Sequence, residues 1–247
     1  MCESPMTSTP SAAERTGRGI RVAVIDSGVA PRHPHIGPIA GGASVDLDGR
    51  VIKGAFDDLL GHGTAVMAAM QEKAPDAEYH AVRVFHRELR TSAQGLCAAI
   101  DWCLDQQMDV VNLSLGTVNA AHAEMLGAAV TRASAAGTWI VAARDAEGKP
   151  CYPGCLPDVI GVGLDWECAR EAYRIAQTDG QLALFASGYP RPVPGVPPRR
   201  NLQGISFAVA NACGFVIRAR EAMGAAPSSE LWNFLSPLNS PEASRLG

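Results

Sequence analysis

The chain has 247 residues, of which 47% are hydrophobic and 19% are charged, and its net charge is −4. This length and balance are typical of one globular domain with a substantial core. The sequence offers no basic stripe for nucleic acid, and no apolar run reaches the roughly 18 residues that cross a bilayer, so we expect neither nucleic acid nor a membrane as a partner.

The predicted elements alternate along the chain. Strands are expected at 21–25, 78–85, 109–115, 138–143, 158–164 and 182–186, and helices at 63–73, 92–107, 120–136, 206–223 and 228–235. We expect Ser92 to cap the second helix, Gly137 to end the third, and Ser228 or Ser229 to cap the last. Short Val- and Ile-rich strands alternating with helices predict an α/β fold, a three-layer sandwich with a mostly parallel central sheet.

The two ends and the proline-rich stretch are expected to lie outside this framework. Residues 1–19 lack the apolar core of a secretory signal and read as a flexible tail, which favours a cytoplasmic protein. Residues 187–200 contain too many prolines for a helix or an inner strand and are expected to form a loop. We expect one domain over 20–224 and a C-terminal tail over 225–247 that carries the short helix.

The cysteines do not suggest a disulfide framework. There are seven, scattered and odd in number, whereas small disulfide-rich domains favour even counts. Cys151 and Cys155 are close enough for a disulfide or half of a metal site, but no second Cys/His pair accompanies them. We expect free thiols.

Three short motifs lie at the ends of predicted elements. Asp26 follows the first strand in D-S-G, His62 opens a helix in G-H-G-T, and Ser206 opens another in G-I-S-F-A. Taken singly, each has an ordinary explanation: a turn aspartate, a histidine bonded to backbone at a helix start, and an N-cap serine. Together they supply the carboxylate, base and hydroxyl of a nucleophilic triad, in the order Asp, His, Ser.

With these motifs the chain resembles the subtilisin-like serine proteases, or subtilases. AVIDSGV, GHGTAV, VVNLSLG, WIVAA, YPGCLPDVIGVG and GISFA are similar to blocks of that family and occur in its order, over about residues 20–218. The resemblance implies a peptidase domain that acts on a peptide or protein and needs no cofactor. It also implies substrate contacts from Ser114, Leu115 and Gly116, and from a facing segment that pairs with an extended peptide, Ser92, Ala93, Gln94 and Gly95.

The chain also departs from the family pattern. Where the family has an Asn that donates to the oxyanion, this sequence has Ala146, and Arg144 is a candidate substitute. The region of the family's main calcium loop is short, so we expect no calcium or other metal there. The four aspartates at 46, 48, 57 and 58 are expected to form a solvated acidic loop rather than ion ligands, while His33 and His35 are candidates to line the cleft.

Two functions follow from this reading. The first is a serine endopeptidase that forms an acyl-enzyme through Asp26, His62 and Ser206, with an intracellular processing role of narrow specificity such as maturation of a precursor peptide. The alternative is a pseudoprotease that keeps the cleft to bind a peptide or a partner protein, because Ala146 leaves the oxyanion hole incomplete.

Overall fold

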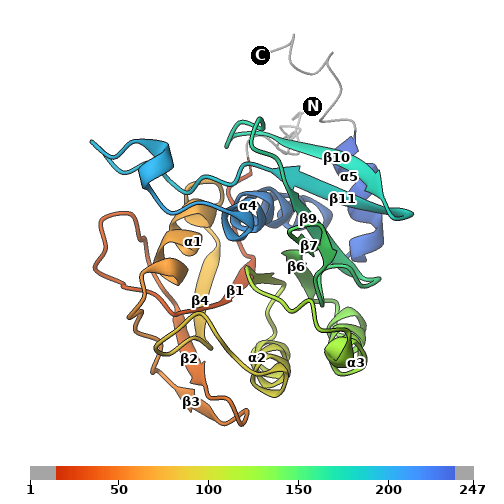
Figure 1. Cartoon of the computed structure of the whole chain (residues 1–247), viewed down its shortest axis with the longest axis horizontal. Helices are drawn as coiled ribbons and strands as arrows, with labels where there is room; N and C mark the ends of the chain where they lie inside the picture. Colours follow the sequence, from red (N-terminus) through yellow and green to blue (C-terminus); the bar gives the residue numbers. More distant parts are fainter. Residues whose placement is uncertain (1–14, 237–247) are drawn as a thin grey trace, which may run out of the picture.

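The computed structural model describes residues 15–236, so residues 1–14 of the tail expected over 1–19 lie outside the described residues, as do residues 237–247. A nine-stranded sheet forms the middle layer (Figure 1), in the order β10-β11-β9-β6-β5-β1-β4-β2-β3. Its strands are β1 Arg21–Asp26, β2 Gly41–Val45, β3 Val51–Lys53, β4 Glu78–Arg83, β5 Val110–Leu113, β6 Trp139–Ala143, β9 Val159–Leu164, β10 Tyr173–Thr178 and β11 Gln181–Ala186. The strands from β11 to β2 pair in parallel, and the two edge strands β10 and β3 are antiparallel.

Helices cover both faces of the sheet, as Figure 1 shows. Helices α1 (His62–Gln71) and α4 (Ile205–Met223) lie side by side on one face, and α2 (Ala93–Asp105) and α3 (Ala123–Ala135) lie on the other. The described chain also has a short last helix, α5 (Leu231–Leu235), and three short 3-10 helices, η1 Ala120–His122, η2 Pro198–Arg200 and η3 Ser228–Glu230. This is the predicted three-layer α/β sandwich.

The two cores follow from the alternation of side chains along each buried strand. In β1, Val22 and Val24 pack with the α1 and α4 side, whereas Ala23 and Ile25 pack with the α2 and α3 side. All four side chains are buried. Because the central strands run parallel, their carboxyl ends lie along the same side of the sheet. Asp26 is the last residue of β1 and lies at that carboxyl edge.

The predicted strands and helices are all present, within a few residues of their expected bounds. Gly137 follows α3 with a φ of 75°, a conformation that favours glycine, and Ser92 caps α2 by accepting a hydrogen bond from the Gly95 N–H. Strands β2, β3 and β10 were not predicted. Strands β3 and β10 are the two edges of the sheet and β2 lies next to β3, and short, glycine-bearing or partly exposed strands of this kind give only a weak apolar pattern.

The C-terminal helix differs from its prediction at its start. Residues 228–235 divide into η3 and α5 (Leu231–Leu235), and no side chain caps either, so the expected cap by Ser228 or Ser229 is wrong. The proline at 227 occupies the N-cap position of η3 instead. Leu231 and Leu235 are buried in the α1 and α4 core, so the segment packs against the domain.

Residues 15–19 are held against the last long helix. The backbone N–H groups of Thr16, Gly17 and Arg18 donate to one carboxylate oxygen of Glu221 in α4, at 3.0, 2.7 and 3.2 Å. Gly17 has a φ of 85°, and a Cβ there would come within 2.9 Å of Ile217. The chain thus enters β1 from a fixed point on α4.

Candidate active site

Asp26 and His62 are joined at the carboxyl edge of the sheet. His62 is the first residue of α1, and its Nδ1 lies 2.7 Å from Asp26 Oδ1, which also accepts a bond from the Ser27 N–H. The Asp26 side chain is fully buried, and the His62 side chain is 13% exposed. Because a carboxylate can only accept, Nδ1 carries the proton, and this leaves Nε2 of the neutral ring as a proton acceptor.

Charges around the imidazole favour its protonated form. Burial by itself would lower the pKa of His62, but the hydrogen bond and negative charge of Asp26, together with the charge of Asp58, raise that pKa above its ordinary value. An imidazole with a raised pKa is a stronger base once it is neutral.

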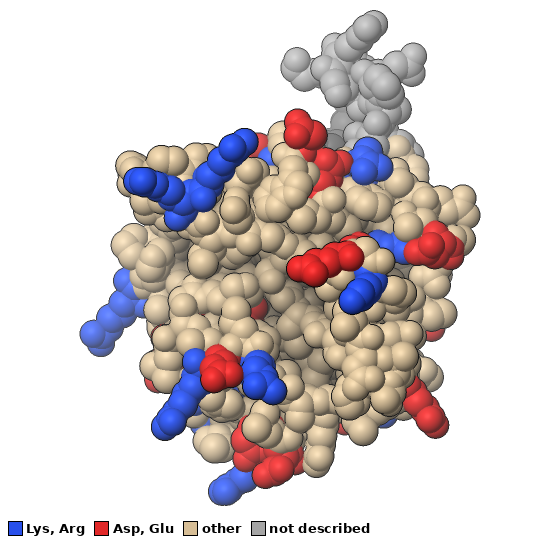
Figure 2. All heavy atoms as spheres, viewed as in Figure 1, with Lys and Arg blue, Asp and Glu red and all other residues tan. Residues whose placement is uncertain are grey.

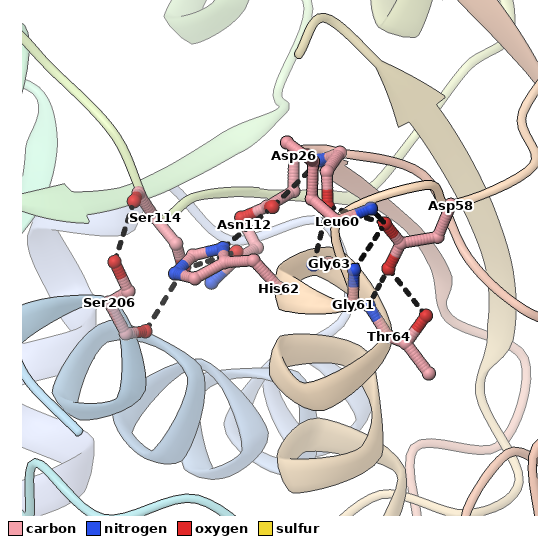
Figure 3. A network of polar contacts seen from close by, with 11 residues as sticks. Asp26, Asp58, Leu60, Gly61, His62, Gly63, Thr64, Asn112, Ser114 and Ser206 are labelled. Atoms are coloured by element: carbon pink, nitrogen blue, oxygen red, sulfur yellow. Dashed lines mark hydrogen bonds and ion pairs between the residues drawn. The ribbon is translucent and has the colours of Figure 1, made fainter. Parts of the chain in front are cut away.

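Ser206 lies in the first turn of α4. Gly204 is the N-cap with a φ of 138°, a conformation open to glycine, and it turns the chain sharply into the helix. The ring of Phe207 lies 5.6 Å from the His62 ring, and Figure 3 shows the imidazole between Asp26 and Ser206. The Ser206 hydroxyl donates to the Ser114 carbonyl oxygen at 3.0 Å, so its proton is directed at Ser114 in this structure.

The segment after β5 touches the start of α4. The Ser114 hydroxyl lies 2.9 Å from Asn112 Oδ1 and 3.0 Å from the carbonyl oxygen of Ser206. Gly116 has no room for a side chain, because a Cβ there would lie 2.5 Å from Cys151 Sγ. The structure therefore brings Ser114 to Ser206 and places Gly116 against Cys151.

A partly buried network around Asp58, which was expected to lie in a solvated loop, holds the start of α1. Asp58 accepts five hydrogen bonds, from Ser27 Oγ, Leu60 N, Gly61 N, Thr64 N and Thr64 Oγ1. Burial alone would raise the pKa of Asp58, but the bonds from Thr64, Leu60 and Gly61 lower it below its usual value. The expectation of a solvated residue is therefore wrong for Asp58. A carboxylate just ahead of a helix start was the signal that could have identified it.

Residue 146, where the family has its oxyanion-donating Asn, lies in a small hairpin. Ala146 is in β7 (Asp145–Ala146), which pairs with β8 (Lys149–Pro150). The Arg144 side chain extends over Gly161 to the β10–β11 turn, where it lies 2.6 Å from Asp179 Oδ2 and 3.4 Å from the Thr178 carbonyl oxygen. Arg144 is thus engaged away from Ser206 and does not serve as the substitute donor.

The segment expected to pair with an extended peptide is mostly helical. Ala93, Gln94 and Gly95 form the first turn of α2, and Ser92 alone is extended, with φ −92° and ψ 158°. The Gly95 N–H is already bonded to Ser92 Oγ at 2.8 Å. The expected strand pairing along residues 92–95 is therefore wrong, because the Ser92 cap starts the helix there.

The described residues also bear on the expectations for cysteines, metal ligands and membrane-spanning helices. The six cysteines of the described chain are free thiols, including Cys151 and Cys155. Among residues 15–236, no three His, Cys, Asp or Glu side chains come together as a metal site. No helix within the same range has the length and apolar character that crossing a membrane requires.

Comparison with known proteins agrees with this geometry. The sequence model of the subtilase family matches residues 17–232. The minor extracellular protease Epr of Bacillus subtilis is 36% identical over 60% of this chain and 23% of its own length. An intracellular serine protease of Paenibacillus polymyxa is 28% identical over 74% of this chain and 61% of its own. The crystal structure of a cold-adapted subtilisin-like serine proteinase aligns with a TM-score of 0.68 at 21% identity, covering 91% of this chain and 84% of that one.

The family model and the solved structure agree on the family and the fold of this chain. The chain belongs to the subtilase family. It spans less than two thirds of the length of the two relatives named above, 23% of one and 61% of the other.

Proposed function

We propose that this protein is a serine endopeptidase in which Ser206 is the nucleophile, His62 the general base and Asp26 the group that orients His62. The observation that carries the proposal is the 2.7 Å contact between His62 Nδ1 and the buried Asp26, beside the helix start that presents Ser206. This contact fixes the tautomer in which Nε2 can accept a proton.

The reaction begins with a rotation of the Ser206 side chain. The hydroxyl then donates its hydrogen bond to His62 Nε2 instead of to the Ser114 carbonyl oxygen. His62 Nε2 takes the proton while Ser206 Oγ forms a bond to the carbonyl carbon of the scissile peptide. The Ser206 N–H, in the first turn of α4, has no acceptor within the helix and is available to the oxyanion. His62 then protonates the leaving amine, the C–N bond breaks, and water hydrolyses the acyl-enzyme by the same route.

On the substrate side, we propose that Ser114, Leu115 and Gly116 contact the acyl part of the peptide. They follow the buried strand β5, and the carbonyl of Ser114 already touches the Ser206 hydroxyl. Ser92, at the start of α2, is exposed enough for a further contact, although it does not continue into a strand. We further propose an intracellular processing role of narrow specificity, which the relative named as an intracellular serine protease supports.

A second function is favoured by one specific observation. Ala146 has no side-chain donor and Arg144 is engaged by Asp179, which would leave the second half of the oxyanion hole without a side-chain donor. Loss of one such donor typically lowers turnover by about 10²–10³-fold. A protein with this deficit retains a cleft that binds a peptide without cleaving it efficiently, which is the pseudoprotease alternative.

Proteolysis of a mixed peptide library separates the two functions. The endopeptidase predicts new peptide termini, identified by mass spectrometry, that the wild-type chain produces and Ser206→Ala does not. If well-folded wild-type protein binds library peptides as tightly as Ser206→Ala and generates no new termini, the binding function is correct and the peptidase proposal fails.

A further inference from the structure

A cavity of about 240 Å³ lies beside His62, on the side away from Ser114. It is enclosed by the segment 30–35 after β1, by α1 and by the loop that precedes Ser206, and we call it the His33–Arg191 pocket. Gly61 and Thr64, which flank His62 in sequence, line it, and so does Leu202. Figure 3 shows Ser114 and Ser206 on one side of the imidazole, with Gly61 and Thr64 on the other.

This position corresponds to the leaving side of a bound peptide. The acyl side is held near Ser114, which touches the nucleophile, and the leaving amine must reach His62 to receive its proton. A peptide that runs from Ser114 across Ser206 and His62 therefore continues toward the far side of the imidazole. The first residues after the scissile bond arrive at the His33–Arg191 pocket.

The polar lining of the pocket includes one guanidinium and two imidazoles. Arg191, His33 and His35 line it, and the two imidazoles stack edge to face with centroids 5.2 Å apart. Burial, followed by nearby positive charge including that of Arg191, lowers the pKa of His35, with only Glu72 acting in the opposite direction. The positive charge that disfavours a proton on His35 favours an anionic ligand in the same pocket.

The acidic groups nearby are already engaged. Asp58 lines the pocket, but its two oxygens accept five hydrogen bonds. Glu72 lies within 4 Å of three cations, at 3.9 Å from Arg191 and 3.8 Å from Lys73, and in direct contact with Arg170. Arg170 also lies 3.7 Å from Glu171, so two carboxylates accompany three cations, which still leaves a positive surplus.

The loop over the pocket adds to this surplus. Residues 187–204 contain three arginines, at 191, 199 and 200, and no Asp or Glu. Figure 2 shows Lys and Arg side chains projecting from the upper left of the molecule, where Figure 1 draws this loop. The floor is apolar, formed by Ala65 and Ala68 of α1, and suits the methylene groups of a short acidic side chain.

From this geometry we propose that the His33–Arg191 pocket binds a carboxylate of the peptide on the leaving side of the scissile bond. The chemistry is that of an Asp or Glu side chain, or of the C-terminal carboxylate of a short leaving peptide. Arg191 supplies the charged hydrogen-bond donor, and the imidazoles of His33 and His35 are further N–H donors in the same lining. The direction of the peptide rests on the proposed function, whereas the preference for an anion does not.

The test measures binding without turnover. Fluorescent hexapeptides with Glu or Gln at one position in turn are titrated into full-length Ser206→Ala and followed by fluorescence anisotropy, each with a free or an amidated C-terminus. We expect a Glu peptide, or a free-acid peptide, to bind about tenfold more tightly than its neutral counterpart. Arg191→Gln in the same background should reduce this ratio to below about twofold, and Arg132→Gln, an arginine on α3 across the sheet, should leave it unchanged.

The outcomes separate this proposal from the peptidase proposal. Equal affinities for charged and neutral peptides, or a ratio that survives Arg191→Gln, would overturn the pocket assignment. If Arg191→Gln unfolds, as judged by circular dichroism, His33→Ala is used instead, because loss of the exposed imidazole N–H should also lower the ratio. A retained preference for the carboxylate in a protein that cleaves nothing would support the pocket and reject only the proposed hydrolysis.

Discussion

The two carboxylate oxygens of Asp26 differ in their hydrogen bonding. One oxygen accepts from His62 and from the Ser27 N–H, while the other, Oδ2, is buried and has no hydrogen-bond partner. On the neighbouring strand β5, Nδ2 of the buried Asn112 also lacks a hydrogen-bond partner. Unpaired polar atoms at this depth are costly, so the site gives up some stability to hold one strong contact on the imidazole. Asp58 contributes to the same imidazole through charge and through the helix start.

The charge of Asp58 makes a prediction about pH. Neutral His62 is the active base, so the acid limb of kcat/KM should lie above the ordinary histidine value of about 6.5. Because the negative charge of Asp58 raises the pKa of His62, Asp58→Asn should move the acid limb to lower pH. The measurement is the profile of kcat/KM between about pH 5 and 9 on a fluorogenic peptide.

The matched control is Asp57→Asn, at an exposed neighbouring aspartate, which should leave the limb in place. An acid limb that stays fixed, or moves to higher pH, in Asp58→Asn would contradict the electrostatic role assigned to Asp58.

At the scale of elements, the β7–β8 hairpin carries Ala146, the position at which the proposed function lacks an oxyanion donor. It connects the end of β6 to Cys151, whose N–H donates to the Arg144 carbonyl oxygen, and it lies beside the segment that contacts Ser206. The hairpin turns through Glu147 and Gly148, both with positive φ. The backbone is therefore a tight reversal, and the proposed oxyanion deficit concerns the side chain of residue 146 and not the hairpin itself.

Replacing that side chain is a direct test. Ala146→Asn should raise kcat toward peptides by up to about 10²–10³-fold, because an amide N–H is added where negative charge develops. Ala136→Asn, at the exposed end of α3, controls for the substitution itself and should leave kcat unchanged. If Ala146→Asn turns over no faster than the wild-type chain, the hairpin does not face the oxyanion.

The elements also show how far the sequence could be read. Buried strands and amphipathic helices were predicted because their apolar periodicity is strong, and the three motif residues stood at element ends. The role of Asp58 was missed because its five donors come from backbone and side chains that only the folded loop brings together. The secondary structure of residues 92–95 was predicted wrongly, because sequence similarity to a family motif does not show at which residue a helix begins.

At the scale of the whole molecule, the C-terminal segment belongs to the domain. The Trp139 Nε1–H donates to the Ala226 carbonyl oxygen, and the Tyr173 hydroxyl donates to that of Leu235. These contacts tie residues beyond 224 to strands β6 and β10 at separate places. The folded unit therefore extends past the boundary expected from the sequence, and α5 completes the core over α4.

Truncating one α5 side chain measures this contribution. Leu231 is fully buried, so Leu231→Ala should lower the free energy of unfolding by about 2–4 kcal/mol. Met125→Ala, at a side chain that is 49% exposed on α3, should change it by less than about 0.5 kcal/mol. Urea denaturation of the two variants gives both values, and a loss below about 1 kcal/mol for Leu231→Ala would show that α5 is not part of the core.

The most direct test of the site is covalent labelling with a fluorophosphonate, located by peptide mapping and mass spectrometry. An activated Ser206 predicts a single adduct on that residue in the wild-type chain, none in Ser206→Ala, and much slower labelling in His62→Ala. Folded wild-type protein that remains unlabelled, or that is labelled equally in Ser206→Ala, would contradict the assignment of Ser206 as a nucleophile activated by His62.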